Sequence, residues 1–229
     1  LTISKSFPKN RGVTIVKHAN PCGVSVKSNK IESYKSALKC DPISAFGGIV
    51  SCNFKIRKKL AIELKKTFLE VIICNGIEKE ALNFLKFKKN LRIIDASKLN
   101  NINLQNVSSS LDGYLFQTTD IDNFSNSNFR TVSKKKPNLK TLKNLIFAFN
   151  VCRFVKSNSI VIVSNHSTVG VGSGQPSRLD SCQIAIDKMK KFADIKNEIV
   201  AASDAFFPFI DGIEKLIQSG AKAIIQPSG

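Results

Sequence analysis

The chain has 229 residues, and its hydrophobic fraction of 42% is enough to bury a core as one large domain or two small ones. No uninterrupted apolar run reaches membrane-spanning length, and the first residues lack the hydrophobic region of a signal peptide. The six cysteines form no Cys-x-x-Cys pair and no cluster with histidine at zinc spacing. This usage favours reduced thiols in a cytoplasmic protein and argues against a structural metal.

The formal net charge of +18 would attract polyanions and raises nucleic-acid binding as one function to consider. However, the lysines are spread along the chain in short groups, and no basic-aromatic interleaving of the kind found in single-strand binders stands out. We interpret the excess as a solvated surface and expect neither a nucleic-acid nor a membrane partner. A basic nucleic-acid-binding protein remains the alternative.

Short apolar runs alternate with amphipathic helical patterns, which predicts an α/β fold with a sheet covered by helices. In residues 1–98 the pattern predicts strands at 13–16, 49–52, 70–73 and 91–94, and helices at 31–39, 56–67 and 78–87. Residues 99–140 are rich in Asn, Ser, Thr and Lys, which predicts a linker or irregular region. In residues 141–229 it predicts helices at 142–155, 176–192 and 213–219, and strands at 159–163 and 223–226. The two halves therefore look like similar α/β/α lobes without a visible residue-level repeat.

The segment from Val13 to Gly23 delivers Lys17 and His18 from a β-branched run into a Pro/Gly turn. Such a turn holds polar side chains at a cleft, where they suit proton transfer. The chain has two histidines, His18 and His166, so an imidazole acid or base has few candidates. The alternative is a strand end with two solvated side chains.

A second motif, Asp41-Pro-Ile-Ser-Ala-Phe46-Gly47-Gly48, separates a predicted helix from a predicted strand. The glycines permit a tight turn and a close approach of backbone to a ligand, while Phe46 offers a flat apolar face. The alternative is an ordinary helix-to-strand connection.

The strand at 159–163 is followed by a glycine-rich stretch, Val169 to Gly174, which predicts a loop, and then by Ser177 and Arg178 in the first turn of a helix. Amides at a helix N-terminus together with a guanidinium make a good phosphate receptor. The glycine spacing matches neither the dinucleotide fingerprint nor the P-loop, so a monophosphate substrate fits better than NAD or ATP. The alternative is a flexible loop beside a surface arginine.

A fourth motif, Ser203-Asp-Ala-Phe206-Phe-Pro-Phe-Ile-Asp211-Gly212, gathers phenylalanines around a proline, with carboxylates on either side. These rings would wall a slot for a planar heterocycle, and Asp211 would pair with an amino-pyrimidine edge. The phenylalanines also fit a core position, and Asp211 also fits a helix start. These two interpretations are compatible.

Taken together, these motifs and Phe154-Val-Lys-Ser-Asn158 resemble the transformylase domain of the bifunctional phosphoribosylaminoimidazolecarboxamide formyltransferase / IMP cyclohydrolase family. The resemblance runs from about Gly12 to Gly229. It implies two cytidine-deaminase-like α/β/α lobes, an intertwined homodimer, and formyl transfer from formyl-tetrahydrofolate to the amino group of the imidazole nucleotide AICAR, a step of purine biosynthesis. It implies formyl-tetrahydrofolate as co-substrate and no catalytic metal.

The resemblance also implies roles for single residues. His18 matches the general base or proton shuttle, Lys17 the group assisting the folate leaving nitrogen, and Asn158 the amide donor to the formyl oxyanion. The implied binding residues are Arg178 for the nucleotide phosphate or ribose, Phe46, Gly47 and Glu70 around the nucleotide, and Phe206 and Asp211 for the pterin-like ring.

The chain departs from the family pattern in four ways, one of which is that an upstream Arg-Tyr-Gly-x-Asn-Pro-His-Gln segment, which helps the family bind the nucleotide, is missing. Ile210 stands where the family commonly has arginine, and neither the cyclohydrolase domain nor the family's later C-terminal segment is present in this sequence. We therefore expect a piece of a longer protein or a truncated form. The alternative to an active formyltransferase is an inactive remnant that still folds or dimerises.

Overall fold

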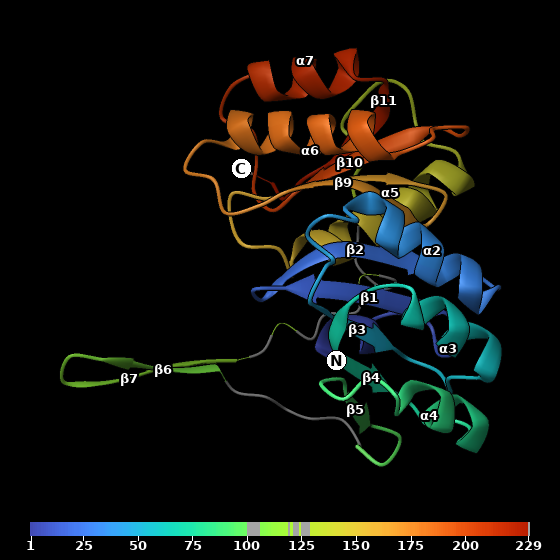
Figure 1. The fold of residues 1–229 in the computed structure, drawn as a ribbon. Helices are drawn as coiled ribbons and strands as arrows, with labels where there is room; N and C mark the ends of the chain where they lie inside the picture. The colour runs from blue at the N-terminus through green and yellow to red at the C-terminus, as the bar shows by residue number, and fades with distance from the viewer. Residues whose placement is uncertain (100–105, 119, 121–123, 125–128, 229) are drawn as a thin grey trace.

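The computed structural model describes residues 1–99, 106–118, 120, 124 and 129–228. A mixed sheet of nine strands runs through the molecule in the order β11-β10-β8-β9-β2-β1-β3-β4-β5 (Figure 1). Its strands are β1 (Gly12–Lys17), β2 (Asn20–Val26), β3 (Gly48–Cys52), β4 (Leu69–Cys74), β5 (Arg92–Asp95), β8 (Ile160–Ser164), β9 (Ser167–Gly172), β10 (Ile199–Ser203) and β11 (Ala221–Ile225). The α/β class predicted from the sequence is confirmed.

The two halves of the sheet repeat one strand order. In the first half the order is β2-β1-β3-β4, and in the second it is β9-β8-β10-β11. Each half begins with an antiparallel hairpin, its first strand is antiparallel to the third, and the third is parallel to the fourth. The halves meet where β2 pairs antiparallel with β9, at Ser25 and Ser167. Equivalent edge strands thus join the halves into one sheet.

Helices cover the sheet in layers (Figure 1). They are α1 (Thr2–Lys5), α2 (Lys30–Cys40), α3 (Lys58–Lys65), α4 (Lys79–Leu85), α5 (Leu139–Cys152), α6 (Arg178–Phe192) and α7 (Asp211–Gln218). The fully buried strand β8 separates two layers, because Ile160 and Ile162 pack with residues of α6 and α7 while Val161 and Val163 pack with α5. Its continuous apolar run follows from burial on both faces.

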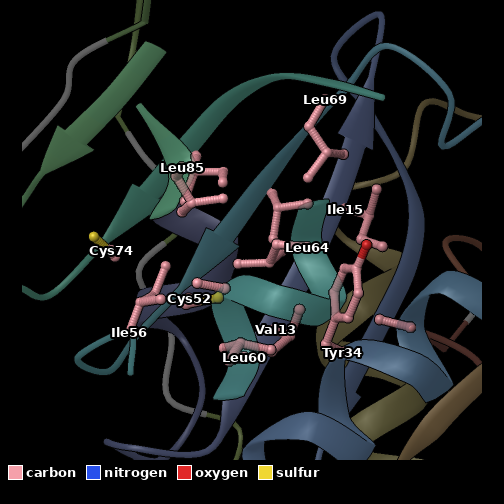
Figure 2. Close-up of a cluster of buried hydrophobic side chains, with 14 of the residues drawn as sticks. Val13, Ile15, Tyr34, Cys52, Ile56, Leu60, Leu64, Leu69, Cys74 and Leu85 are labelled. Carbon is pink, nitrogen blue, oxygen red and sulfur yellow. The ribbon is translucent and has the colours of Figure 1, made fainter. Parts of the chain in front are cut away.

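The core of the first half lies between β1, β3 and β4 and the helices α2 and α3 (Figure 2). Val13 and Ile15 point from β1 toward the same layer as Leu60 and Leu64 of α3, as the period of two in a strand requires. The buried Tyr34 donates a hydrogen bond from its hydroxyl to Thr67 Oγ1 at 2.9 Å. The Tyr34 ring therefore packs in the apolar core, while its hydroxyl group has a hydrogen-bond partner.

Two glycines at equivalent places let the helices lie close to the sheet. A Cβ on Gly23 of β2 would overlap the carbonyl oxygen of Ala37 in α2, and a Cβ on Gly170 of β9 would overlap that of Ala185 in α6. Each hairpin therefore approaches the helix that follows it more closely than any larger residue permits.

This close approach corrects one expectation. The stretch around Gly170 was expected to be a glycine-rich loop, but Ser167–Gly172 forms the strand β9. Its glycines let α6 pack close to the sheet. Because glycine has a low β-propensity, the sequence pattern did not indicate a strand here. The strands β2 and β10 were also not predicted. Proline and glycine interrupt the pattern of β2, and β10 is too short and too uniformly apolar to alternate.

A hairpin of β6 (Asn106–Ser110) and β7 (Gly113–Gln117) projects away from the main sheet (Figure 1). It lies in the region expected to be a linker or irregular. The side chains of β7 are all exposed, including Tyr114 at 71% and Phe116 at 70%. A two-stranded ribbon with uncovered apolar side chains is of marginal stability alone.

The six cysteines are buried free thiols. Burial is the main cause that raises the pKa of each, for example that of Cys22 to about 11. Among the helices of the described residues, none combines the length and apolar character needed to cross a bilayer.

One ion pair links the two halves on the face of the sheet that α2 and α6 cover. Lys188 of α6 lies 2.8 Å from Asp41, which follows α2 and is only 4% exposed. Burial would raise the pKa of the Asp41 carboxyl, but hydrogen bonds from Lys188 and from the backbone and hydroxyl of Ser44 hold that pKa below its ordinary value. These hydrogen bonds therefore stabilise the charged form of the Asp41 carboxyl.

We expect Asp41→Asn to lower the free energy of unfolding at pH 7 by about 1.5–3 kcal/mol, the worth of hydrogen bonds to a charged group. Because the folded pKa is lowered, this stabilisation is present above the unfolded pKa of about 3.9 and is lost as pH falls through the folded pKa. Urea unfolding at several pH values between 7 and 3 should show the difference between wild type and variant shrinking toward the acid end.

The matched control is Asp194→Asn, because Asp194 makes an exposed ion pair with Lys196 at 3.4 Å. Exposed pairs contribute about 0–1 kcal/mol, so this variant should unfold nearly as wild type does. Equal destabilisation by the two variants would contradict the role given to Asp41.

Candidate functional site

The predicted site residues lie along one edge of the sheet. The hairpin pairing of Lys17 with Asn20, and of Val16 with Ile49, brings the end of β1 beside the starts of β2 and β3. In the second half, Ile160 at the start of β8 pairs with the last residues of both β9 and β10. Because β2 and β9 are antiparallel, these two sets of strand ends share the same edge.

Lys17 and His18 stand at the tight turn between β1 and β2. The two central residues of this turn, His18 and Ala19, have φ angles of 49° and 62°. This left-handed region suits a two-residue hairpin but is unfavourable for residues other than glycine. The turn therefore holds His18 in a strained backbone conformation, and the His18 side chain is exposed at the tip of the turn.

Lys17 is held against the loop before β3. Its Nζ donates to the carbonyl oxygens of Phe46 at 3.1 Å and Gly47 at 2.9 Å. Gly47 has a φ of 67°, and a Cβ there would lie 2.8 Å from Lys17 Nζ and 3.3 Å from Glu70 Oε1. The absence of a side chain at Gly47 thus allows an ammonium and a carboxylate to approach one backbone position.

An aromatic pair flanks this cluster. The rings of Phe46 and Phe68 lie 4.9 Å apart, and Phe46 remains 65% exposed. Beside them is an open depression of about 400 Å³, lined by Phe68, Glu70, Lys89, Asn90 and Arg92. An exposed aromatic face next to charged groups suits a planar polar ligand.

The turn of the first half contacts the second half directly. Asn20, two residues after His18, accepts a hydrogen bond at its Oδ1 from the backbone N–H of Lys156 at 3.0 Å. Lys156 is two residues before Asn158. The predicted imidazole and the predicted carboxamide therefore belong to neighbouring segments, although 140 positions of sequence separate them.

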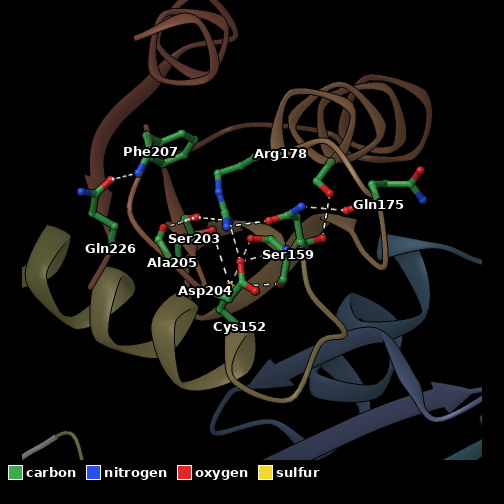
Figure 3. A network of polar contacts seen from close by, with 12 residues as sticks. Cys152, Ser159, Gln175, Arg178, Ser203, Asp204, Ala205, Phe207 and Gln226 are labelled. Carbon is green, nitrogen blue, oxygen red and sulfur yellow. Dashed lines mark hydrogen bonds and ion pairs between the residues drawn. The ribbon is translucent and has the colours of Figure 1, made fainter. Parts of the chain in front are cut away.

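Arg178 and Asp204 lie in a partly buried polar network (Figure 3), to which Asn158 also belongs. Arg178 donates from Nη2 to Asn158 Oδ1 at 2.6 Å, and from Nη1 to Asp204 Oδ1 at 2.6 Å and Ser203 Oγ at 2.7 Å. Asp204 Oδ1 also accepts from the backbone N–H of Ser159 at 2.9 Å. The start of β8, the end of β10 and the start of α6 are thus tied together.

This network fixes the orientation of the Asn158 amide. Arginine carries only donors, so the oxygen of the amide must face Arg178 and the nitrogen must face away. That nitrogen donates to the carbonyl oxygens of Gln175 and Pro176, each at 2.8 Å. For Asn158 to donate to a ligand, one of these two hydrogen bonds has to be released.

Asp204 was quoted in a motif but was given no role by the sequence analysis. Burial would raise the pKa of its carboxyl, but hydrogen bonds from Ser157, Arg178 and the Ser159 N–H hold that pKa below its ordinary value. Asp204 is thus a charged partner that balances Arg178, whose side chain is only 13% exposed. A sequence signal that could have indicated this role is an acidic residue directly after the short apolar run of β10, which the sequence analysis did not predict as a strand.

Phe206 and Asp211 follow β10 at the same edge, beyond this network. Phe206 is 47% exposed, and the neighbouring Phe207 lies 5.9 Å from the Arg178 guanidinium. Asp211 is the first residue of α7, and its carboxylate accepts from the N–H of Gly212 at 2.7 Å. No hydrogen bond among the described residues joins these two to the Lys17 cluster.

The structure therefore sorts the predicted residues into three neighbouring groups. The first group is Lys17, His18, Phe46, Gly47 and Glu70, the second is Asn158 and Arg178, and the third is Phe206 and Asp211. His166 lies at the opposite edge, where it ends up beside Phe147. Within the described residues, His, Cys, Asp and Glu nowhere gather in a group of three or more that could hold a metal ion.

Comparison with known proteins identifies relatives of the whole chain. The chain is 41% identical over 228 residues to the bifunctional purine biosynthesis protein PurH of Leptospira biflexa, covering 99% of this chain and 44% of that protein. It is 42% identical to the PurH proteins of Rhodospirillum rubrum and Aquifex aeolicus, over 95% and 97% of this chain and 43% of each relative. The chain thus spans less than half the length of these relatives.

A family model described as the AICARFT/IMPCHase bienzyme matches residues 1–188. This range includes the turn at Lys17 and His18, the Phe46-Gly47 loop and the Asn158–Arg178 contact. From the extent of this match and the identity to the relatives above, we conclude that the chain belongs to the AICARFT/IMPCHase bienzyme family.

Proposed function

We propose that this edge of the sheet carries the formyl transfer from formyl-tetrahydrofolate to the amino group of AICAR, a step of purine biosynthesis. The observation that carries the proposal is the hydrogen bond from Lys156 to Asn20, which brings the His18 turn next to the Asn158 segment. A proton acceptor and an oxyanion donor must both reach one formyl carbon, and neighbouring segments meet that need.

In the proposed reaction the amine nitrogen of AICAR attacks the formyl carbon. His18 takes the proton that the amine loses as the new C–N bond forms, because an aromatic amine is a poor nucleophile without a base. The negative charge that develops on the formyl oxygen is stabilised by the amide of Asn158. The bond from carbon to the folate nitrogen then breaks, and that nitrogen takes up the proton that His18 removed from the amine, while Lys17 assists its departure.

The remaining residues would bind the two substrates. We assign Arg178 to the phosphate or ribose of the nucleotide, Phe46, Gly47 and Glu70 to its heterocycle, and Phe206 and Asp211 to the pterin-like ring. The exposed rings of Phe46 and Phe206 support this assignment, since flat apolar faces stack on planar ligands. No resident cofactor or catalytic metal is part of the proposal, and formyl-tetrahydrofolate is consumed as co-substrate.

We infer that residues 1–98 and 141–229 are two cytidine-deaminase-like lobes separated by a connecting region at 99–140. The repeated strand order supports two lobes of one topology. We place the protein in the cytoplasm, and the buried free thiols support a reducing compartment.

We also propose that the chain forms a homodimer through the hairpin of β6 and β7. Val107 and Phe116 pair across the hairpin, as do Ser109 and Tyr114, so these side chains share one face. An apolar face this exposed is typical of an interaction surface.

The first prediction from the proposed function concerns His18. We expect His18→Asn to lower the rate of formyl transfer by about 10²–10⁴-fold, the usual contribution of a positioned base. Asparagine tolerates the left-handed backbone of this turn, so the fold should be kept. The assay follows tetrahydrofolate formation in the 229-residue chain with saturating AICAR.

His166→Asn is the matched control, because His166 has a φ of 55° in the equivalent turn at the other edge of the sheet. It should leave the rate unchanged. A chain that unfolds cooperatively yet shows no turnover dependent on His18 would favour the inactive remnant over the enzyme.

A second prediction concerns Asn158. We expect Asn158→Asp to lower kcat by about 10²–10³-fold, because the carboxylate keeps an acceptor for Arg178 but donates nothing to the formyl oxygen. KM for AICAR should rise by a smaller factor than kcat falls, because Arg178, which we assign to AICAR, gains a second carboxylate partner. A loss confined to KM, with kcat intact, would show that Asn158 only helps to bind substrate.

A third prediction tests the dimer. Replacing Tyr114 and Phe116 together with serine should shift the chain toward monomers in sedimentation equilibrium, because buried aromatic residues contribute most to interfaces. The control replaces Ser108, on the other face of the hairpin, with alanine. An unchanged dimer in the double variant would contradict the assigned interface.

A further inference from the structure

The repeated strand order places a second tight turn at the opposite edge of the sheet. The turn between β8 and β9 has Asn165 and His166 at its centre, with φ angles of 48° and 55°. This turn is the counterpart of His18 and Ala19 between β1 and β2. The antiparallel pairing of β2 with β9 sends the two turns to opposite edges.

Beside this second turn lies a cavity of about 220 Å³. Two of its walls are α2, through Ser36 and Lys39, and the segment 193–197 between α6 and β10. That segment has the same place in the second half that residues 41–47 have in the first, between the helix after the hairpin and the next strand. The cavity and the Lys17 cluster therefore occupy equivalent places in the repeat.

The cavity is lined by cations and hydroxyl groups. The charged residues that line the cavity are one acidic residue, Asp194, and three lysines, Lys27, Lys39 and Lys196. Lys196 pairs with Asp194 at 3.4 Å, whereas in the part of the chain that the structure describes neither Lys27 nor Lys39 has an acidic side chain within 4.0 Å. A concave surface with two unbalanced ammonium groups attracts a small anion.

The polar groups deeper in the cavity are already held in place. Ser167 Oγ is 2.7 Å from Ser25 Oγ, and Ser164 Oγ donates to the carbonyl oxygen of Glu198 at 3.1 Å. The floor of the cavity is therefore the junction between the two halves. An anion bound there would contact both halves of the sheet at once.

We propose that this cavity is a second ligand site, which binds a phosphate dianion between Lys27 and Lys39 of the first half and the Asn165 turn of the second. Its volume holds a phosphate with part of a sugar, and its described lining offers no aromatic face for a base. The ligand is thus free phosphate or a simple sugar phosphate. Binding here is independent of formyl transfer at the other edge.

The test titrates the 229-residue chain with inorganic phosphate and, separately, with ribose 5-phosphate at constant ionic strength. Amide resonances of Asn165, Ser167 and Val169 should shift in at least one titration, and the tighter ligand identifies the source of the phosphate. Replacing Lys27 and Lys39 with glutamine should raise that Kd about tenfold or more, because two ammonium groups that line the cavity are lost.

The control replaces the exposed Lys134 and Lys135 with glutamine, which removes the same charge away from the cavity. It should leave Kd unchanged. Equal weakening in both variants would overturn the proposal in favour of diffuse attraction to a basic surface. Shifts at His18 and Gly47 with none at Asn165 would also overturn it, and the absence of any shift with either ligand would do the same. Unchanged melting temperatures confirm that both variants fold.

Discussion

The antiparallel pairing of β2 with β9 is the constraint on which this molecule depends. Without it, two small sheets would each expose an edge strand, and each would carry half of a site. The contact is reinforced by Val24 N–H donating to Thr168 Oγ1 at 2.9 Å and Val26 N–H donating to the carbonyl oxygen of His166 at 2.9 Å. Strand direction at this single junction decides which loops become neighbours.

The second half of the candidate site depends on a partly buried ion pair. The side chains of Arg178 and Asp204 are each less than a fifth exposed, and hydrogen bonds to a charged group contribute about 1.5–3 kcal/mol. The pair also orients Asn158, since a guanidinium accepts no hydrogen bond. The same contacts therefore stabilise this part of the fold and orient the Asn158 side chain. The first half relies instead on backbone carbonyls, which hold the Lys17 ammonium without a buried acidic partner.

The sequence predicted the helices α2 to α7 and the strands β1, β3, β4 and β8 well, because elements such as α5, α6 and β8 have strong apolar patterns. It missed β2 and β9 because their glycines are required by close contact with α2 and α6, and a local sequence pattern gives no information about such contacts. It named Asn158 and Arg178 but not their mutual hydrogen bond, since that contact depends on how β8, β9 and α6 meet. It gave no sign that Asn20 touches Lys156, because long-range contacts leave no periodic signature.

The buried cysteines carry a consequence for how this protein is handled. A thiol whose pKa is raised by burial has little thiolate at neutral pH, and thiolate is the form that alkylating and oxidising reagents attack. These side chains lie in the cores of both halves, on both faces of the sheet. Modification therefore requires local opening, so the labelling rate of each cysteine reports how often its own layer comes apart.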